Sequence, residues 1–189
     1  MIRRLSDSNV YVAITGFKNA KIGDVDRLFD EVKKKLGDVA AVQFFDAKLI
    51  ATWQHLYFAA LTALTAFNDK TNISNNLAIE TLLYASAQRQ IKKATEIMGI
   101  KPKTSEVAVL IIAEKQKAVT TALKTVQILF SAEQDESVLE LSLEKIKSIK
   151  RFFGISEVEL AAKLEKDGME KEALVDLVIE HGALLATQR

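Results

Sequence analysis

Residues 107–113 read Val-Ala-Val-Leu-Ile-Ile-Ala, and this segment is the strongest indication of the fold class. It is the longest purely apolar run in the chain. Seven residues cannot cross a bilayer, which takes about 20 residues in a helix. An unbroken apolar run of this length is instead typical of a central strand that is covered on both faces. The sequence therefore predicts a sheet buried between layers, and no membrane-spanning segment.

The rest of the chain supplies further strands and many helices. Strands are predicted over residues 10–15, ending at Gly16, and over residues 39–45. Apolar residues at three- and four-residue spacing predict helices over 24–36, 53–67, about 77–87, about 89–98 and 114–130, with Pro102 breaking the chain between the last two. After Glu133 the pattern is helical throughout, and the last helix is predicted over 171–186.

These elements predict an α/β (α+β) fold. We expect a single layered domain over residues 1–189, with a three- to four-stranded mixed or antiparallel sheet packed by about seven to eight helices. The C-terminal third is expected to be all helical. Gly37 is a predicted helix stop, any of the polar residues 74–76 could cap the next helix, and Ser137–Glu140 and Ser156–Glu159 have capping-box spacing.

Composition indicates an ordinary globular protein of a reducing compartment. Of 189 residues, 49% are hydrophobic and 27% are charged, and there is no cysteine for a disulfide or a thiolate metal site. Residues 1–10 lack the apolar segment of a secretion signal. We therefore expect a cytoplasmic protein, with the nucleus also open if the source is eukaryotic.

Catalytic motifs are missing from the sequence. All seven glycines stand alone, so neither a dinucleotide fingerprint nor a P-loop is present, and we expect no cofactor. The two histidines, His55 and His181, are far apart and have no metal-binding spacing. Each lies in a predicted helix with periodically spaced apolar residues. The simpler interpretation is a histidine packed in the core or facing a partner, and the alternative is a role in acid–base catalysis.

A basic cluster lies between residues 88 and 103. Arg89, Lys92, Lys93, Lys101 and Lys103 face only Glu96 there, although the whole chain has a net charge of only +1. One interpretation is a solvated helix face. The other is an anion site, in which the start of a helix adds free backbone N–H groups and its dipole to the side-chain charge.

A phosphate backbone would suit such a site. The amides of Gln88 and Gln90 could read unpaired bases, and Tyr84 is either a stacking surface or a core residue. The last helix has an apolar stripe of Leu177, His181, Leu184 and Leu185, which either closes the core or docks into a partner's groove.

Two regions of the sequence resemble the TPRKB family, the small regulatory subunit of the KEOPS (EKC) complex. The residues that carry the resemblance are His55-Leu56, Ala59, Ala60, Phe67, Glu80, Leu82 to Tyr84, Ser86, Gln88 to Ile91, Ala94 and Gly99-Ile100, followed by Ile179-Glu180 and Ala183 to Leu185. The resemblance covers about residues 10–185. Ala87 departs from a common glycine, and His181-Gly182 stands where the family motif has Arg-Val.

The resemblance implies a non-catalytic subunit of the complex that makes threonylcarbamoyladenosine in tRNA. The implied partners are the PRPK-type kinase/ATPase subunit, the 3′ CCA end of tRNA and, indirectly, the threonylcarbamoyltransferase subunit. Carried over by motif, the RNA-binding candidates are Ser86, Gln88, Arg89, Gln90, Lys92 and Lys93. The partner-binding candidates are Leu177, His181, Leu184 and Leu185. Two alternatives remain: a protein-only adaptor that regulates the kinase-like subunit without touching RNA, and an independent small enzyme.

Overall fold

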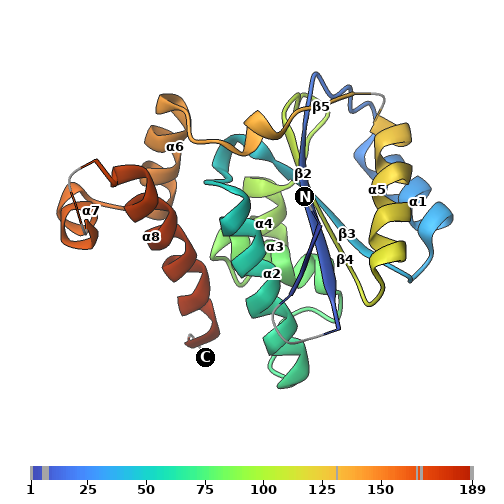
Figure 1. Ribbon diagram of the computed structural model, residues 1–189, viewed down its shortest axis with the longest axis horizontal. Coiled ribbons are helices and arrows are strands. Elements are labelled where there is room, and N and C mark those ends of the chain that lie inside the picture. Colours follow the sequence, from blue (N-terminus) through green and yellow to red (C-terminus); the bar gives the residue numbers. More distant parts are fainter. Residues whose placement is uncertain (1, 6–8, 131, 165, 167, 188–189) are drawn as a thin grey trace.

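The computed structural model describes residues 2–5, 9–130, 132–164, 166 and 168–187, which form a sheet between two helical layers (Figure 1). The strands are β1 (Ile2–Arg4), β2 (Tyr11–Lys18), β3 (Ala41–Asp46), β4 (Val107–Ala113) and β5 (Glu133–Gln134). Their order is β1-β2-β4-β3, with β5 also paired to β2, and all pairings are antiparallel. The antiparallel form of the prediction is thus confirmed. The short strands β1 and β5 are the ones that the sequence did not predict.

The helices divide between the two faces of the sheet. α1 (Val25–Leu36) and α5 (Gln116–Phe130) cover one face. The other face carries α2 (Trp53–Asn68), α3 (Leu77–Ser86), α4 (Ile91–Met98), α6 (Leu143–Phe153) and α8 (Glu170–Leu184). α7 (Glu157–Lys163) packs on α8, and short 3₁₀ turns lie at η1 (Ala47–Leu49), η2 (Glu136–Leu139) and η3 (Leu185–Thr187).

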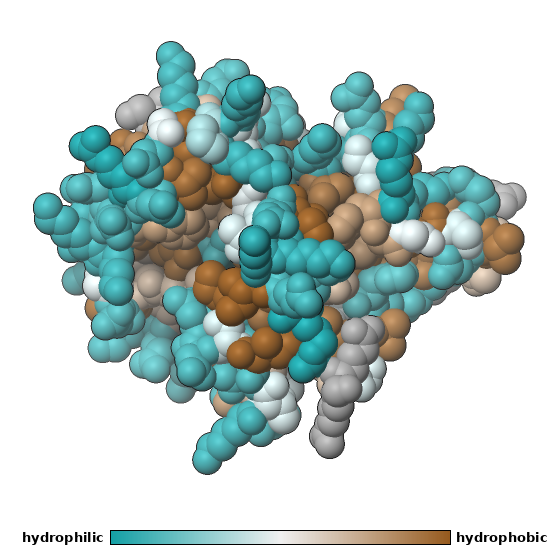
Figure 2. Space-filling view, turned by 180° about the vertical axis from the view of Figure 1, so that it is seen from behind, coloured by the Kyte–Doolittle hydropathy of each residue, from teal (hydrophilic) through white to brown (hydrophobic). Residues whose placement is uncertain are grey.

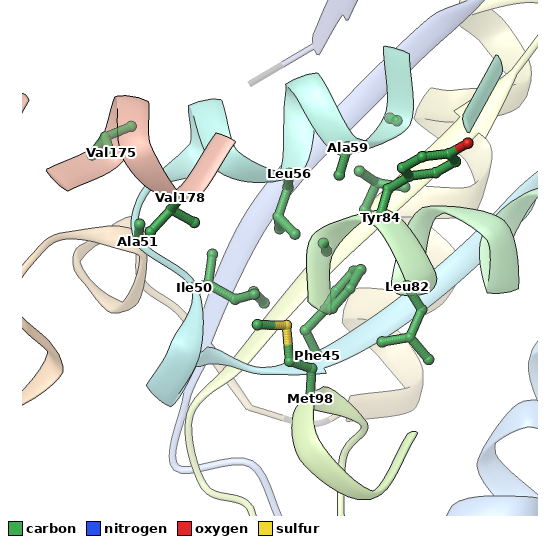
Figure 3. Packing of buried hydrophobic residues seen from close by; sticks show 14 of the residues in the cluster. Phe45, Ile50, Ala51, Leu56, Ala59, Leu82, Tyr84, Met98, Val175 and Val178 are labelled. Atoms are coloured by element: carbon green, nitrogen blue, oxygen red, sulfur yellow. The ribbon is translucent and has the colours of Figure 1, made fainter. Parts of the chain in front are cut away.

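Strand β4 lies between β2 and β3 and is buried along its whole length, as its apolar run predicts. Its even-numbered residues, such as Leu110, pack into the cluster that contains Leu56 and Leu83. Its odd-numbered residues, such as Val109, pack beneath α5. In Figure 3, side chains of the first cluster from α2, α3, α4 and α8 converge over the sheet. Since successive side chains of a strand point to opposite faces, a strand covered on both faces needs apolar residues at every position.

The prediction that the strand over residues 10–15 ends at Gly16 is wrong, because this strand, β2, continues to Lys18. A Cβ atom at Gly16 would lie 2.5 Å from the carbonyl oxygen of Asp135 and 2.1 Å from a methyl group of Val138. The chain from β5 into η2 crosses β2 at this point, and the Asp135 N–H donates to the Gly16 carbonyl at 2.9 Å. The glycine therefore permits a close backbone approach inside the strand.

Capping residues explain most helix boundaries. Asp24 caps α1, Asn76 caps α3, and Ser156 with Glu159 forms the predicted capping box of α7. The predicted box at Ser137–Glu140 is wrong: η2 lies there, Asp135 caps it, and the next helix, α6, is capped by Ser142. Within the described residues, no helix is both long and apolar enough to cross a membrane.

Candidate nucleic-acid and partner interfaces

The turn between α3 and α4 contains three of the six RNA-binding candidates, and the other three lie in the helices on either side of it. The N–H of Ala87 donates to the carbonyl of Tyr84 at 3.2 Å, and the N–H of Gln88 donates to that of Leu83 at 3.1 Å. These two bonds form a Schellman motif, which closes the C-terminus of α3. Ala87 has φ 49° and ψ 38°, in the left-handed region that favours glycine. A glycine, which the family resemblance implies here, would adopt this conformation without strain, and Ala87 adopts it as well.

The structure separates the candidates by exposure. Arg89, Gln90, Lys92 and Lys93 are exposed, and Gln88 is half-buried. Ser86 is fully buried, and its hydroxyl donates to the carbonyls of Leu82 and Leu83 at 2.8 and 3.2 Å. Its side chain therefore supports the end of α3 and does not reach the surface.

Helix α4 begins later than the sequence predicts, at Ile91, so Arg89 lies in the turn and not in the helix. Gln90 is the N-cap and makes no capping hydrogen bond through its side chain. The first N–H groups of an α-helix have no partner within the helix. Arg89, Lys92 and Lys93 are therefore grouped around a helix start, whereas Lys101 and Lys103 follow its other end.

Tyr84 is a core residue and not a stacking surface, since its side chain is only 3% exposed. Burial and the nearby charge of Glu80 raise the pKa of its hydroxyl, and the Arg89 charge opposes that shift. In Figure 3 the Tyr84 ring lies near Ala59 of α2.

His55 holds α2 against the end of α3. The Ala51 N–H donates to its Nδ1 at 3.3 Å, so the proton is on Nε2, which donates to the Ala85 carbonyl at 2.9 Å. Burial lowers the pKa of His55 to about 4, and the charge of Lys145 acts in the same direction. This histidine is therefore a neutral core residue with both ring nitrogens bonded, as the simpler interpretation predicts.

Glu80 is a structural carboxylate that the sequence analysis did not identify as such. It is fully buried and accepts hydrogen bonds from the N–H groups of Ile73, at 3.1 Å, and Ser74, at 2.7 Å. It thereby fixes the loop before α3. A glutamate inside an otherwise apolar helical stretch is the signal that could have revealed it.

The last helix shares its apolar stripe between core and surface. Leu177 and Leu185 are buried, at 8% and 1% exposure. His181 is half-buried, with its ring 5.9 Å from that of Phe153. Leu184 is 53% exposed.

Near this end of α8, Phe58 of α2 is 41% exposed and shares a shallow crevice with Ala183. We use the name apolar end of α8 for the surface that includes Leu184 of α8 and Phe58 of α2. Viewed from behind, polar groups cover most of the surface, and apolar groups gather in several patches between them (Figure 2).

The features that would indicate an enzyme do not meet in the structure. His55 lines a crevice of about 10 Å³, and no carboxylate of the described residues is among those that line this crevice. Over the described ranges, no three histidine, aspartate or glutamate side chains are placed to hold a metal ion.

Two comparisons with known proteins identify relatives. Residues 22–185 match the family model described as "Kinase binding protein CGI-121". The "Regulatory protein Cgi121" of Methanocaldococcus jannaschii is 30% identical over 135 residues, which is 71% of this chain and 83% of the relative. Both descriptions are those of binding or regulatory proteins, in agreement with the prediction that the chain is not an enzyme.

Proposed function

The chain belongs to the CGI-121 family of kinase-binding proteins, and we propose that it is the KEOPS subunit that joins the kinase-like subunit to the 3′ CCA end of tRNA. TPRKB is the human name in this family, so the resemblance seen in the sequence is confirmed. We further propose that the chain assembles into KEOPS, binds tRNA and is located in the cytoplasm.

The proposed RNA binding rests on the exposed cations at the turn between α3 and α4 and at the start of α4. Arg89, Lys92 and Lys93 are all exposed and surround a helix start whose N-cap side chain makes no capping bond. Positive side chains and unpaired N–H groups are the donors that a phosphodiester backbone needs. Gln88 and Gln90 flank Arg89 and add amides that can bond to unpaired base edges.

For the kinase contact we propose the apolar end of α8. Leu184 and Phe58 are large apolar side chains exposed to solvent. Leu177 and Leu185 support the helix from below, and His181 lies at the margin of the contact. Apolar residues with a polar surround are typical of protein interfaces.

A gel shift with intact tRNA and with tRNA lacking its CCA end tests the RNA part. Intact tRNA should bind more tightly, and affinity should fall with salt with a slope of about −2 if three phosphates of a single strand are contacted. Arg89→Glu should abolish the difference between the two tRNAs. Lys103→Glu is the matched control, because Lys103 is also an exposed cation but follows the other end of α4.

Equal binding of both tRNAs by the unaltered protein would refute the RNA part and leave the protein-only adaptor. The kinase part is tested separately by co-purification with the PRPK-type subunit. Leu184→Asp should reduce recovery of the complex. Ile128→Asp should not, since Ile128 is 74% exposed on α5, on the other side of the sheet.

A further inference from the structure

A cavity of about 660 Å³ opens between the N-terminal part of α8, the start of α2 and η2. Neither the turn at Arg89 nor the apolar end of α8 lines it, so the two proposed interfaces leave it unexplained. Its volume lies in the range of about 300–1,000 Å³ that is usual for ligand sites. Its floor is apolar and is formed by Val12, Ile14, Leu139, Leu141 and Val175.

The rim of the cavity is acidic. Its carboxylates are Glu136, Glu140, Glu172 and Asp176, against the cations Arg3 and Lys171, which leaves a formal net charge of −2. Glu172 and Asp176 are four residues apart on α8 and therefore share one face of that helix. The Oε1 atom of Glu136 accepts a hydrogen bond from the Thr15 hydroxyl at 2.7 Å, and Thr15 does not line the cavity, so this carboxylate already has a partner outside it. A phosphate would meet repulsion here, whereas a cation would be attracted.

The chain already places one cation against this wall. The guanidinium carbon of Arg3 lies 4.4 Å from the centre of the Trp53 ring. Tyr57 packs edge-on to Trp53, with ring centres 6.1 Å apart. Aromatic faces attract guanidinium and ammonium groups. The wall thus presents an aromatic surface suited to basic side chains.

Two buried polar atoms in the lining are without partners. The Oε1 atom of Gln54 and the Oγ1 atom of Thr52 are both buried, and neither makes a hydrogen bond to the described residues. A buried amide oxygen without a donor is costly. Because neither atom has accessible surface, an incoming N–H group could bond to the Gln54 oxygen only after that side chain turned toward the cavity.

From these features we propose that the cavity binds a basic segment of a protein partner, with arginine or lysine at the acidic rim and apolar side chains on the floor. The carboxylates lie on two separate elements, η2 with its following residue and α8, so they line the opening along its length and are suited to several basic groups in a row. A single small cation would use only part of this rim and little of the apolar floor.

Trp53 is the only tryptophan in the chain, so its fluorescence reports binding at this cavity. The probe is an acetylated, amidated hexapeptide of alternating leucine and arginine. A peptide with glutamine in place of arginine is the control ligand, and spermidine tests a small cation. The arginine peptide should change Trp53 emission saturably, with affinity that falls as salt is added. The glutamine peptide should not bind.

The double variant Glu172→Gln with Asp176→Asn should weaken binding of the arginine peptide by about tenfold, since each exposed ion pair contributes a few-fold. Glu144→Gln with Glu170→Gln is the matched control. This double variant also removes two negative charges, but from exposed residues that do not line the cavity. Equal effects of the two double variants would overturn the proposal. So would equal binding of the glutamine peptide, or spermidine saturating the signal at the same concentration as the arginine peptide.

Discussion

The Nε2–H of His55 donates to the carbonyl oxygen of Ala85 at 2.9 Å and so joins the first turn of α2 to the last turn of α3. The turn between α3 and α4, which contains Arg89, begins two residues later, at Ala87. A core histidine thus supports the base of the proposed RNA-binding turn without taking part in chemistry.

The burial of His55 predicts a pH dependence of stability. The pKa of His55 is lowered to about 4 in the folded protein, from 6.5 when unfolded. Between those values the unfolded chain binds a proton that the folded chain does not, so stability is full above about pH 6.5 and falls as the pH drops toward 4. The loss should approach about 3 kcal/mol.

Urea unfolding at pH 7.5, 6 and 5 measures this loss. His55→Gln should be less stable at neutral pH. The slope of its unfolding free energy against pH should correspond to about one proton fewer than in the unaltered protein. His181→Gln, which changes the half-buried histidine, should keep the original slope. An unchanged slope in His55→Gln would show that other groups cause the dependence.

Glu80→Gln should destabilise the protein by about 2 kcal/mol, because the buried carboxylate accepts bonds from the backbone N–H groups of Ile73 and Ser74. An amide can turn only one oxygen toward these donors. Glu96→Gln, at an exposed position on α4, is the control and should change little. Thermal unfolding compares the two, and equal melting temperatures would contradict the assigned role.

Gly182→Val should destabilise the protein by about 2 kcal/mol. A Cβ atom at Gly182 would lie 2.7 Å from the carbonyl oxygen of Tyr84, so a larger residue would push α8 away from α3. Ala183→Val introduces the same side chain at an exposed position of α8 and is the control, since the lower helix propensity of valine should cost it only about 0.5 kcal/mol. Chemical denaturation should separate the two variants. A fully stable Gly182→Val protein would mean that α8 can shift at little cost.

Ala87→Gly should stabilise the protein by about 0.5–1 kcal/mol, because alanine is strained in the left-handed conformation by more than glycine costs in chain entropy. Ala118→Gly, within α5, should have the opposite sign. Both free energies follow from denaturant titrations. A destabilised Ala87→Gly protein would show that the turn tolerates alanine without strain.

The sequence predicts the parts of this fold that depend on local pattern. The apolar run at 107–113 and the periodic helix at 53–67 are both found, because burial on both faces or on one stripe requires those patterns. The strands β1 and β5 are too short to show a pattern, and their pairing with β2 depends on distant residues. Likewise, nothing local shows that Gly16 lies under a crossing chain.

The same distinction between local pattern and tertiary packing applies to the candidate functional residues. The sequence places Arg89, Lys92 and Lys93 together because they are neighbours along the chain. It does not show that Ser86 and Leu185 are buried, which depends on how α3 and α8 pack. The cavity beside Trp53 gathers residues from β1 to α8, so only the folded chain reveals it.

Finally, the proposed binding surfaces all lie on one side of the sheet. Both proposed interfaces and the cavity lie with α2, α3, α4 and α8, whereas α1 and α5 cover the opposite face (Figure 1). A dye or a tether for surface immobilisation can therefore be attached to the exposed residues of α1 without obstructing any of them. Lys34 offers one such attachment point.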